Sequence, residues 1–138
     1  MPEASFAPAL LTARAGEYVI FLRDFVTGFS VGIHPHEQER RQRIRINVDL
    51  IVHHPGPEFP DDIAAVVSYE SIVEDIRRLT EQKHINLIES LAERIAALCL
   101  HDQRVRRTRV QVEKLEVFPE AVSVGVVVER GRDAIPLS

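Results

Sequence analysis

The sequence predicts an α+β fold, in which a four-stranded antiparallel sheet is covered on one face by two sequential helices. Two observations favour this class. Extended segments rich in β-branched residues occur in pairs, two before and two after a central region. In that central region, apolar residues recur every three or four positions, which indicates two amphipathic helices. Strands grouped on both sides of two sequential helices are typical of α+β proteins.

The first two strands are predicted before the helices. Residues 18–26 are rich in aromatic and β-branched side chains, which favours a strand. Residues 43–50 alternate strictly between polar and apolar, so we expect a half-buried strand whose polar side chains face outward. Residues 53–62 contain three prolines and a glycine and are expected to form a loop.

Two helices are predicted next. Ser68 is the expected N-cap of the first, whose apolar face comprises Tyr69, Ile72, Val73, Ile76 and Leu79. The second helix is expected from Asn86 to about Leu100, and its apolar face comprises Ile88, Leu91, Ile95, Leu98 and Cys99. Asn86 and Glu89 have the spacing of a capping box, in which each side chain satisfies a backbone N–H. The spacing alone favours this cap over the alternative, a carboxylate that binds a ligand.

The last two strands are predicted at residues 105–116 and 121–130. We therefore expect a loose N-terminal extension over residues 1–17, a single domain over residues 18–130 and a tail over residues 131–138. A four-stranded sheet with one helical layer leaves its other face and its edges uncovered. Association with further copies of the chain would cover both, so we expect a homo-oligomer.

Composition excludes several functional classes. A net charge of −4 argues against non-specific binding of nucleic acid, which needs clustered basic residues. Apolar runs are too short to cross a bilayer, and Glu3 with no basic region before the first apolar run argues against a signal peptide. Cys99 is the single cysteine, which fits a cytoplasmic protein without disulfides, and its place on the apolar helix face indicates a small core residue.

Lys114 breaks the pattern of its strand. Val110 and Val112 mark the inward face, and Lys114 is the next residue in that register. Its ammonium group either escapes past the end of the strand or enters a pocket, where partial burial would lower its pKa and allow it to transfer protons. The sequence leaves both alternatives open.

Other polar and aromatic residues have simpler interpretations. Tyr69 heads the first helix, where a ring is more often part of the core than catalytic, and Glu37 lies in a loop, where a glutamate is usually solvated. In the basic run of residues 40–45, Arg43 and Arg45 are expected on the outward face, solvated, at a subunit surface or attracting an anionic substrate. Four histidines lack a third ligand at a familiar spacing, so no metal site is predicted: His34, His36, His53 and His54.

Four segments together resemble the dihydroneopterin aldolase family, which includes the dihydroneopterin triphosphate 2′-epimerases. They are Gly-Ile-His-Pro-His-Glu at residues 32–37 with Arg41 and Gln42, Val-Val-Ser-Tyr at 66–69, Asn-Leu-Ile-Glu-Ser-Leu-Ala-Glu-Arg-Ile-Ala at 86–96, and Val-Gln-Val-Glu-Lys at 110–114. In order, the resemblance covers residues 18–130. It implies the tunnelling fold, in which four subunits join their sheets into a barrel and two rings often stack into an octamer. Active sites in that family lie between neighbouring subunits.

The resemblance also implies roles for individual residues. Glu89 matches the glutamate that anchors the pterin, since a carboxylate can accept two parallel hydrogen bonds from the 2-amino-4-oxopyrimidine edge. Lys114 matches the lysine proposed to act near N5 of the dihydropterin, Tyr69 a tyrosine that helps proton transfer, and Glu37 a loop glutamate that arranges the hydroxylated side chain. Substrate binding would also involve Ile88 and Val67.

The implied reaction needs no metal or cofactor, because the C6=N5 imine of the pterin accepts the electrons of the broken bond. The products would be 6-hydroxymethyl-7,8-dihydropterin and glycolaldehyde, and re-addition of glycolaldehyde would epimerise C2′. Val31 stands where many aldolases have histidine, and the segment after Lys114 lacks their usual Pro-Gly turn. A dedicated 2′-epimerase and a non-catalytic pterin- or purine-binding protein therefore remain alternatives.

Overall fold

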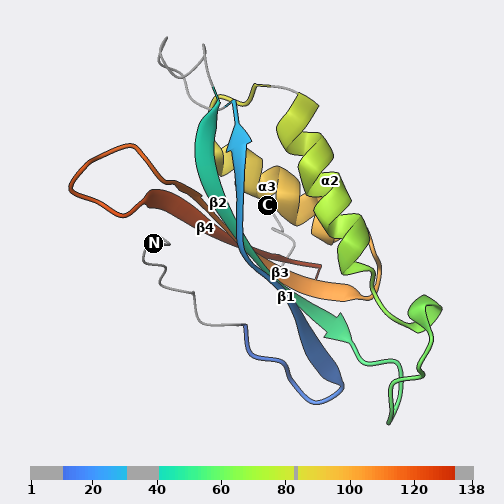
Figure 1. The fold of residues 1–138 in the computed structure, drawn as a ribbon. Coiled ribbons are helices and arrows are strands. Elements are labelled where there is room, and N and C mark those ends of the chain that lie inside the picture. Colours follow the sequence, from blue (N-terminus) through green and yellow to red (C-terminus); the bar gives the residue numbers. More distant parts are fainter. Residues whose placement is uncertain (1–10, 31–40, 83, 133–138) are drawn as a thin grey trace.

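The computed structural model describes residues 11–30, 41–82 and 84–132. Four strands form one antiparallel sheet in the order β1-β2-β3-β4, and two helices, α2 and α3, lie on one of its faces (Figure 1). The strands are Glu17–Phe29 (β1), Gln42–His53 (β2), Val105–Lys114 (β3) and Val124–Gly131 (β4), and the helices are Tyr69–Gln82 (α2) and Ile88–Cys99 (α3). A short 3₁₀ helix, η1, covers Ile63–Ala65. The predicted α+β architecture is confirmed.

The ends of the strands differ from the prediction. β1 continues through Gly28 to Phe29, because Gly28 still pairs with Arg43. β3 ends at Lys114 and β4 begins at Val124, so the loop covers residues 115–123 and is longer than the predicted connection of residues 117–120. This loop projects beyond the body of the sheet (Figure 1).

Apolar side chains of the sheet and both helices form the core. The register pairs Ile46 with Val112 and Val48 with Val110, so alternate residues of β2 and β3 face the helices together. Burial of each such side chain contributes roughly 1.5–3 kcal/mol. Cys99 packs in the same core, and burial raises the pKa of its thiol to about 12. The predicted core role of Cys99 is therefore confirmed.

The outer face of the sheet, opposite the helices, does not match the prediction of a solvated polar side. Arg45, Asn47 and Asp49 are between 1% and 4% exposed. Arg45 donates two hydrogen bonds to the carboxylate of Glu113 on β3, at 2.9 and 3.0 Å. A β-bulge in β1 places Arg23 opposite Asn47, and its guanidinium reaches Asn47 and Asp49.

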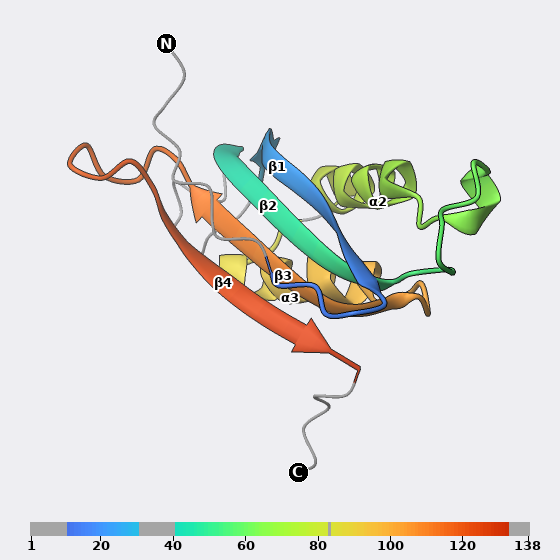
Figure 2. The same cartoon turned by 90° about the horizontal axis from the view of Figure 1, so that it is seen from below.

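Both outer strands leave one edge without a partner inside the described chain. The order of the sheet places β1 at one edge and β4 at the other (Figure 2). Val124 and Val127 on β4 are 42% and 47% exposed, and Phe21 on β1 is 54% exposed. These open, partly apolar edges support the expectation of further association. Of the helices in the described segments, none is long and apolar enough to cross a membrane.

Candidate active site

Lys114 lies at the last position of β3, on the face that the helices cover. It pairs with Ile44 on β2 and with Val124 on β4. Residues two and four positions earlier, Val112 and Val110, are fully buried on that same face. The ammonium group is therefore delivered to the end of the core, where the side chain is half-buried.

Glu89 lies in the first turn of α3, but it does not form the predicted capping box. The N-cap is Leu87, which has extended backbone angles and provides no side-chain hydrogen bond. Asn86 therefore precedes the cap and Glu89 is the second helical residue, so neither side chain is in position for the reciprocal contacts. Within the described residues the exposed carboxylate of Glu89 has no hydrogen bond or ion pair. It is available to a ligand, beside the positive end of the helix dipole.

Chain topology brings Glu89 and Lys114 to the same end of the molecule. A short turn after α3 sends the chain back as β3, so the start of the helix and the end of the strand lie together (Figure 1). Ile88, which precedes Glu89, is buried in the core and fixes the first turn of α3 against the sheet. Glu37 lies outside the described residues, in the connection between β1 and β2 that leaves from this same end.

Contacts that the sequence analysis missed join this end of the sheet to the connection between α2 and α3. The hydroxyl of Ser30 lies 2.6 Å from Nδ1 of His84, and the N–H of Ile85 donates to the Ser30 carbonyl at 3.0 Å. Arg41 donates to the Thr80 carbonyl of α2 at 2.9 Å. Arg41 belongs to the first segment that resembles the family, so the sequence offered a signal that could have identified it. Ser30 and His84 carry no such signal, because their contact spans 54 residues.

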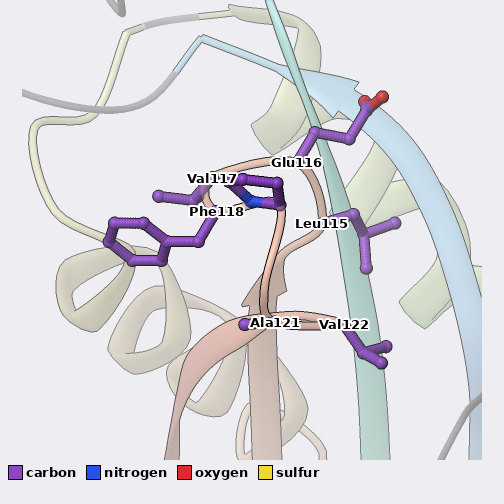
Figure 3. Close-up of a pocket in the computed structure, with 7 residues that line it drawn as sticks. Leu115, Glu116, Val117, Phe118, Ala121 and Val122 are labelled. Atoms are coloured by element: carbon purple, nitrogen blue, oxygen red, sulfur yellow. The ribbon is translucent and has the colours of Figure 1, made fainter.

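A shallow hollow of about 590 Å³ opens in the loop that follows Lys114. Leu115 and Val122 lie on one side of the loop, whereas Val117 and Phe118 point away from them (Figure 3). The lining is apolar apart from Glu116, whose carboxylate lies 3.8 Å from the guanidinium of Arg43. The loop therefore adds an apolar wall next to Lys114.

Tyr69 and Val67 lie at the opposite end of the molecule. Ser68 caps α2 as predicted, since the N–H of Ser71 donates to its hydroxyl at 3.2 Å. Val67 is 3% exposed, but Tyr69 is 63% exposed, so the interpretation of its ring as a core side chain is wrong. The first turn of α2 packs beside the end of α3, and α3 is about 18 Å long. A single copy of the chain therefore separates Tyr69 from Glu89 and Lys114.

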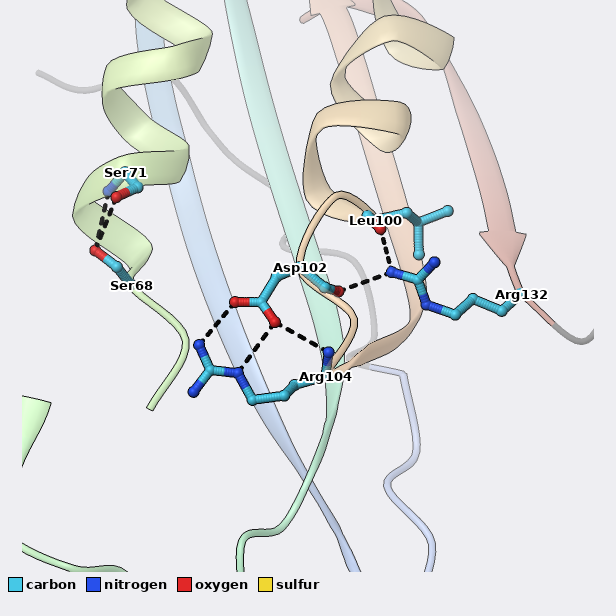
Figure 4. A network of polar contacts seen from close by, with 6 residues as sticks. All are labelled: Ser68, Ser71, Leu100, Asp102, Arg104 and Arg132. Atoms are coloured by element: carbon cyan, nitrogen blue, oxygen red, sulfur yellow. Dashed lines mark hydrogen bonds and ion pairs between the residues drawn. The ribbon is translucent and has the colours of Figure 1, made fainter. Parts of the chain in front are cut away.

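Several polar groups at this end of the molecule are paired within the protein. Asp102 accepts hydrogen bonds from the Arg104 guanidinium at 2.8 and 3.0 Å, and these bonds lower the pKa of its carboxyl group (Figure 4). Arg132 donates to the backbone carbonyls of Leu100 and Asp102. This end offers a shallow hollow of about 360 Å³, whose lining includes Val67, Ser68 and Arg104.

Comparison with known proteins identifies one family. A family model described as dihydroneopterin aldolase matches residues 20–129. The dihydroneopterin aldolase of Streptomyces coelicolor is 34% identical over 83 residues, which is 60% of this chain and 70% of that protein.

Two solved structures share the fold. The dihydroneopterin aldolase of Burkholderia thailandensis, bound to guanine, has a TM-score of 0.75 and 32% identity, over 86% of this chain and 94% of that chain. The Escherichia coli dihydroneopterin aldolase, in complex with neopterin, has a TM-score of 0.72 and 24% identity, over 83% of this chain and 99% of that chain.

Proposed function

This chain belongs to the dihydroneopterin aldolase family, and from that premise we propose how its own residues carry out the reaction. The family's activity makes the chain a carbon–carbon lyase of folate biosynthesis. Its substrate would be 7,8-dihydroneopterin, and the pterin-like ligands of the two related structures support a site for such a ring. The observation that carries the proposal is the carboxylate of Glu89, which is exposed at the end of the molecule where Lys114 emerges.

Glu89 would orient the ring. Its two oxygens accept hydrogen bonds from a ring N–H and the 2-amino group, while the first turn of α3 holds the carboxylate in place. Buried Ile88 gives that turn a fixed base, and Val67 would border the ring from the other half of the site. Such orientation supplies much of the rate enhancement when the substrate itself provides the electron sink.

Proton transfer would complete the reaction. Removal of the 2′-hydroxyl proton lets the C1′–C2′ bond break, so that C2′ becomes the aldehyde carbon of glycolaldehyde. The bonding electrons form a C1′=C6 double bond and N5 gains a proton. Addition of a proton to C1′ and loss of the proton from N5 then restore the C6=N5 imine and give 6-hydroxymethyl-7,8-dihydropterin. Lys114 would act near N5 of the pterin. Tyr69 would help proton transfer at the substrate's side chain, and Glu37 would arrange that hydroxylated side chain.

The complete site would need a second copy of the chain. Tyr69 and Val67 lie about the length of α3 away from Glu89, so they would come from a neighbouring subunit. The edges of β1 and β4, which have no partner within the described residues, are suited to join four copies into a ring, and two rings would give an octamer. The single, buried Cys99 fits a reducing compartment, and we place the reaction in the cytoplasm.

A dedicated 2′-epimerase is the second candidate, and the loop after Lys114 is the observation that favours it. That loop is apolar and lacks the Pro-Gly turn of many aldolases. It would retain glycolaldehyde long enough for re-addition with the opposite configuration at C2′.

Incubation of the purified protein with 7,8-dihydroneopterin, followed by chromatography of the products, tests the proposal. We expect 6-hydroxymethyl-7,8-dihydropterin with an equimolar amount of glycolaldehyde. Formation of the C2′ epimer faster than cleavage would favour the epimerase instead. Binding of the pterin with neither product would leave only a binding protein and would refute both.

A further inference from the structure

A row of polar side chains crosses the outer face of the sheet at the end where Lys114 emerges. Arg45 on β2 donates two hydrogen bonds to Glu113 on β3, and the hydroxyl of Ser123 donates to the same carboxylate at 2.5 Å. Glu113 is only 8% exposed. Burial by itself would raise the pKa of its carboxyl group, but the hydrogen bonds from Arg45 and Ser123 hold that pKa below its usual value. An ionised, buried carboxylate is therefore held by a partner on each side.

The row continues to β1 through Asp24. This residue lies in the β-bulge, and its φ of 55° is in the left-handed region, which aspartate adopts more readily than most residues. Its backbone N–H donates to Oδ1 of Asn47 at 2.8 Å, and its carboxylate lies 3.8 Å from Nε of Arg45. Because Ser123 directly precedes β4, this polar row of Asp24, Arg45, Glu113 and Ser123 links all four strands.

The polar row also holds one end of the loop that follows Lys114. Ser123 is the last residue of that loop, and Leu115 is its first. The N–H of Leu115 donates to the Arg43 carbonyl of β2 at 3.1 Å, and its side chain is buried. Between these two attachments the loop is exposed, and Phe118 points away from Leu115 (Figure 3). The loop is therefore fixed at both ends and free only in its middle.

Glu113 connects the polar row to Lys114. Successive residues of a strand point to opposite faces, so Glu113 joins the row while Lys114 faces the helices. Gly125 on β4 pairs with Glu113, and a Cβ at Gly125 would lie 2.2 Å from the carbonyl oxygen of Val112. Only glycine allows β4 to lie so close to this part of β3. The backbone that carries Lys114 is thus held from both neighbouring strands.

We propose that Arg45, Glu113 and Ser123 are positioning residues, which hold Lys114 and the loop of residues 115–123 in fixed places beside the substrate. This inference rests on the proposed function, because it gives the polar row a part in that reaction. The three side chains lie on the outer face and act on the other face through the end of β3 and through the loop. A displacement of about 1 Å at a reacting group can lower a rate about a hundredfold, so a group outside the site can control turnover.

Ser123→Ala is the variant that tests this role, because it removes one hydrogen bond and leaves the ion pair of Arg45 and Glu113 in place. Amide hydrogen exchange of residues 115–123, followed by mass spectrometry, should become about tenfold faster. The kcat for 7,8-dihydroneopterin should fall about tenfold, whereas the KM should change less than about twofold, because Glu89 still orients the ring. Ser123→Thr keeps the hydroxyl and should restore both the exchange rate and kcat.

Thr108→Val is the matched control. Thr108 lies near the other end of β3, and its hydroxyl donates a buried hydrogen bond to the Asp49 carbonyl at 2.9 Å. Its loss should lower the stability of the protein but leave kcat and the exchange of the loop unchanged. An equal loss of kcat in Thr108→Val would show that any weakened sheet lowers turnover, and would overturn the proposal.

Two further results would also overturn it. They are exchange of the loop at the wild-type rate in Ser123→Ala, and faster exchange with an unchanged kcat. A wild-type chain that turns over no pterin would refute the proposed function instead. Faster exchange in Ser123→Ala would then still support the hold of the polar row on the loop, so the two failures are distinguishable.

Discussion

The two ends of the sheet use their polar groups differently. At the end where Lys114 emerges, the carboxylate of Glu89 is exposed and makes no hydrogen bond or ion pair within the described segments. At the end where α2 begins, Asp102 pairs with Arg104, and Arg132 occupies two backbone carbonyls (Figure 4). Polar groups already satisfied inside the protein have little capacity left for a ligand. The exposed carboxylate of Glu89 fits our proposal that this end holds the polar substrate.

The second end contributes exposed side chains instead. Tyr69 is 63% exposed and Ile63 on η1 is 77% exposed, and Phe59 in the preceding loop is 47% exposed. Large apolar side chains that remain exposed are frequent at contact surfaces. We therefore expect two half-sites. One binds the pterin ring, and the other, from a neighbouring copy of the chain, completes the active site.

The largest effect is expected from Lys114→Ala, which tests the ring-binding end. Loss of a group that transfers protons should lower kcat by about 10²–10⁴, while the Kd for a pterin changes only a few-fold. Glu89→Gln should instead abolish pterin binding, because it removes one acceptor of the paired hydrogen bonds. Product assays and binding titrations separate the two variants. Unchanged turnover in Lys114→Ala would remove Lys114 from the mechanism.

Mixing variants tests whether the two ends meet between copies. Tyr69→Phe and Lys114→Ala should each be nearly inactive alone. After unfolding and refolding together in equal amounts, about a quarter of the interfaces should carry both wild-type halves, so about a quarter of the activity should return. Refolding each variant separately before mixing is the control. If the activity stays at the level of the separate variants, both residues belong to one copy and the half-site model is wrong.

Local patterns in the sequence predicted the layers of this fold because they record burial directly. Strict alternation over residues 43–50 identified β2, and helical spacing identified α2 and α3, as the register and burial confirm. Pattern alone could not show that Tyr69 is exposed, since the first residue of a helix can lie beyond the elements that cover the rest of its apolar face. The capping box failed for a similar reason, because a cap depends on backbone angles that begin the helix one residue later than expected.

Long-range contacts explain what the sequence could not predict. Arg45 appeared to be solvated because it alternates with isoleucines, but its partner Glu113 is 68 residues away. Asp49 is covered by Leu11, which is 38 residues away. The family-like segments indicated candidate site residues without such contacts, but the separation of Tyr69 from Lys114 became visible only once the elements were placed in space.

Stability measurements should show a further contrast between the two ends. Glu113→Ala leaves the guanidinium of Arg45 buried without its main partner and should lower the free energy of unfolding by about 3–5 kcal/mol. Asp102→Ala breaks a more exposed pair and should cost less than about 1 kcal/mol. Denaturant unfolding of both variants against the wild type measures this. Equal losses would mean that the Arg45 pair is no more important to the fold than a surface ion pair.

The smallest effect is expected in the pH dependence at the Tyr69 end. Hydrogen bonds from Arg104 hold the pKa of Asp102 below its usual value of 3.8, so the folded state binds its proton less readily than the unfolded state. Asp102 therefore stabilises the protein above about pH 4, and this contribution is lost as the pH falls through the lowered pKa. Asp102→Asn should accordingly be less stable than the wild type at pH 6, and the difference should shrink towards pH 3. An Asp61→Asn variant in the exposed loop before η1 is the control. A difference that stays constant across this range would mean that the Asp102 pair acts through its shape and not through its charge.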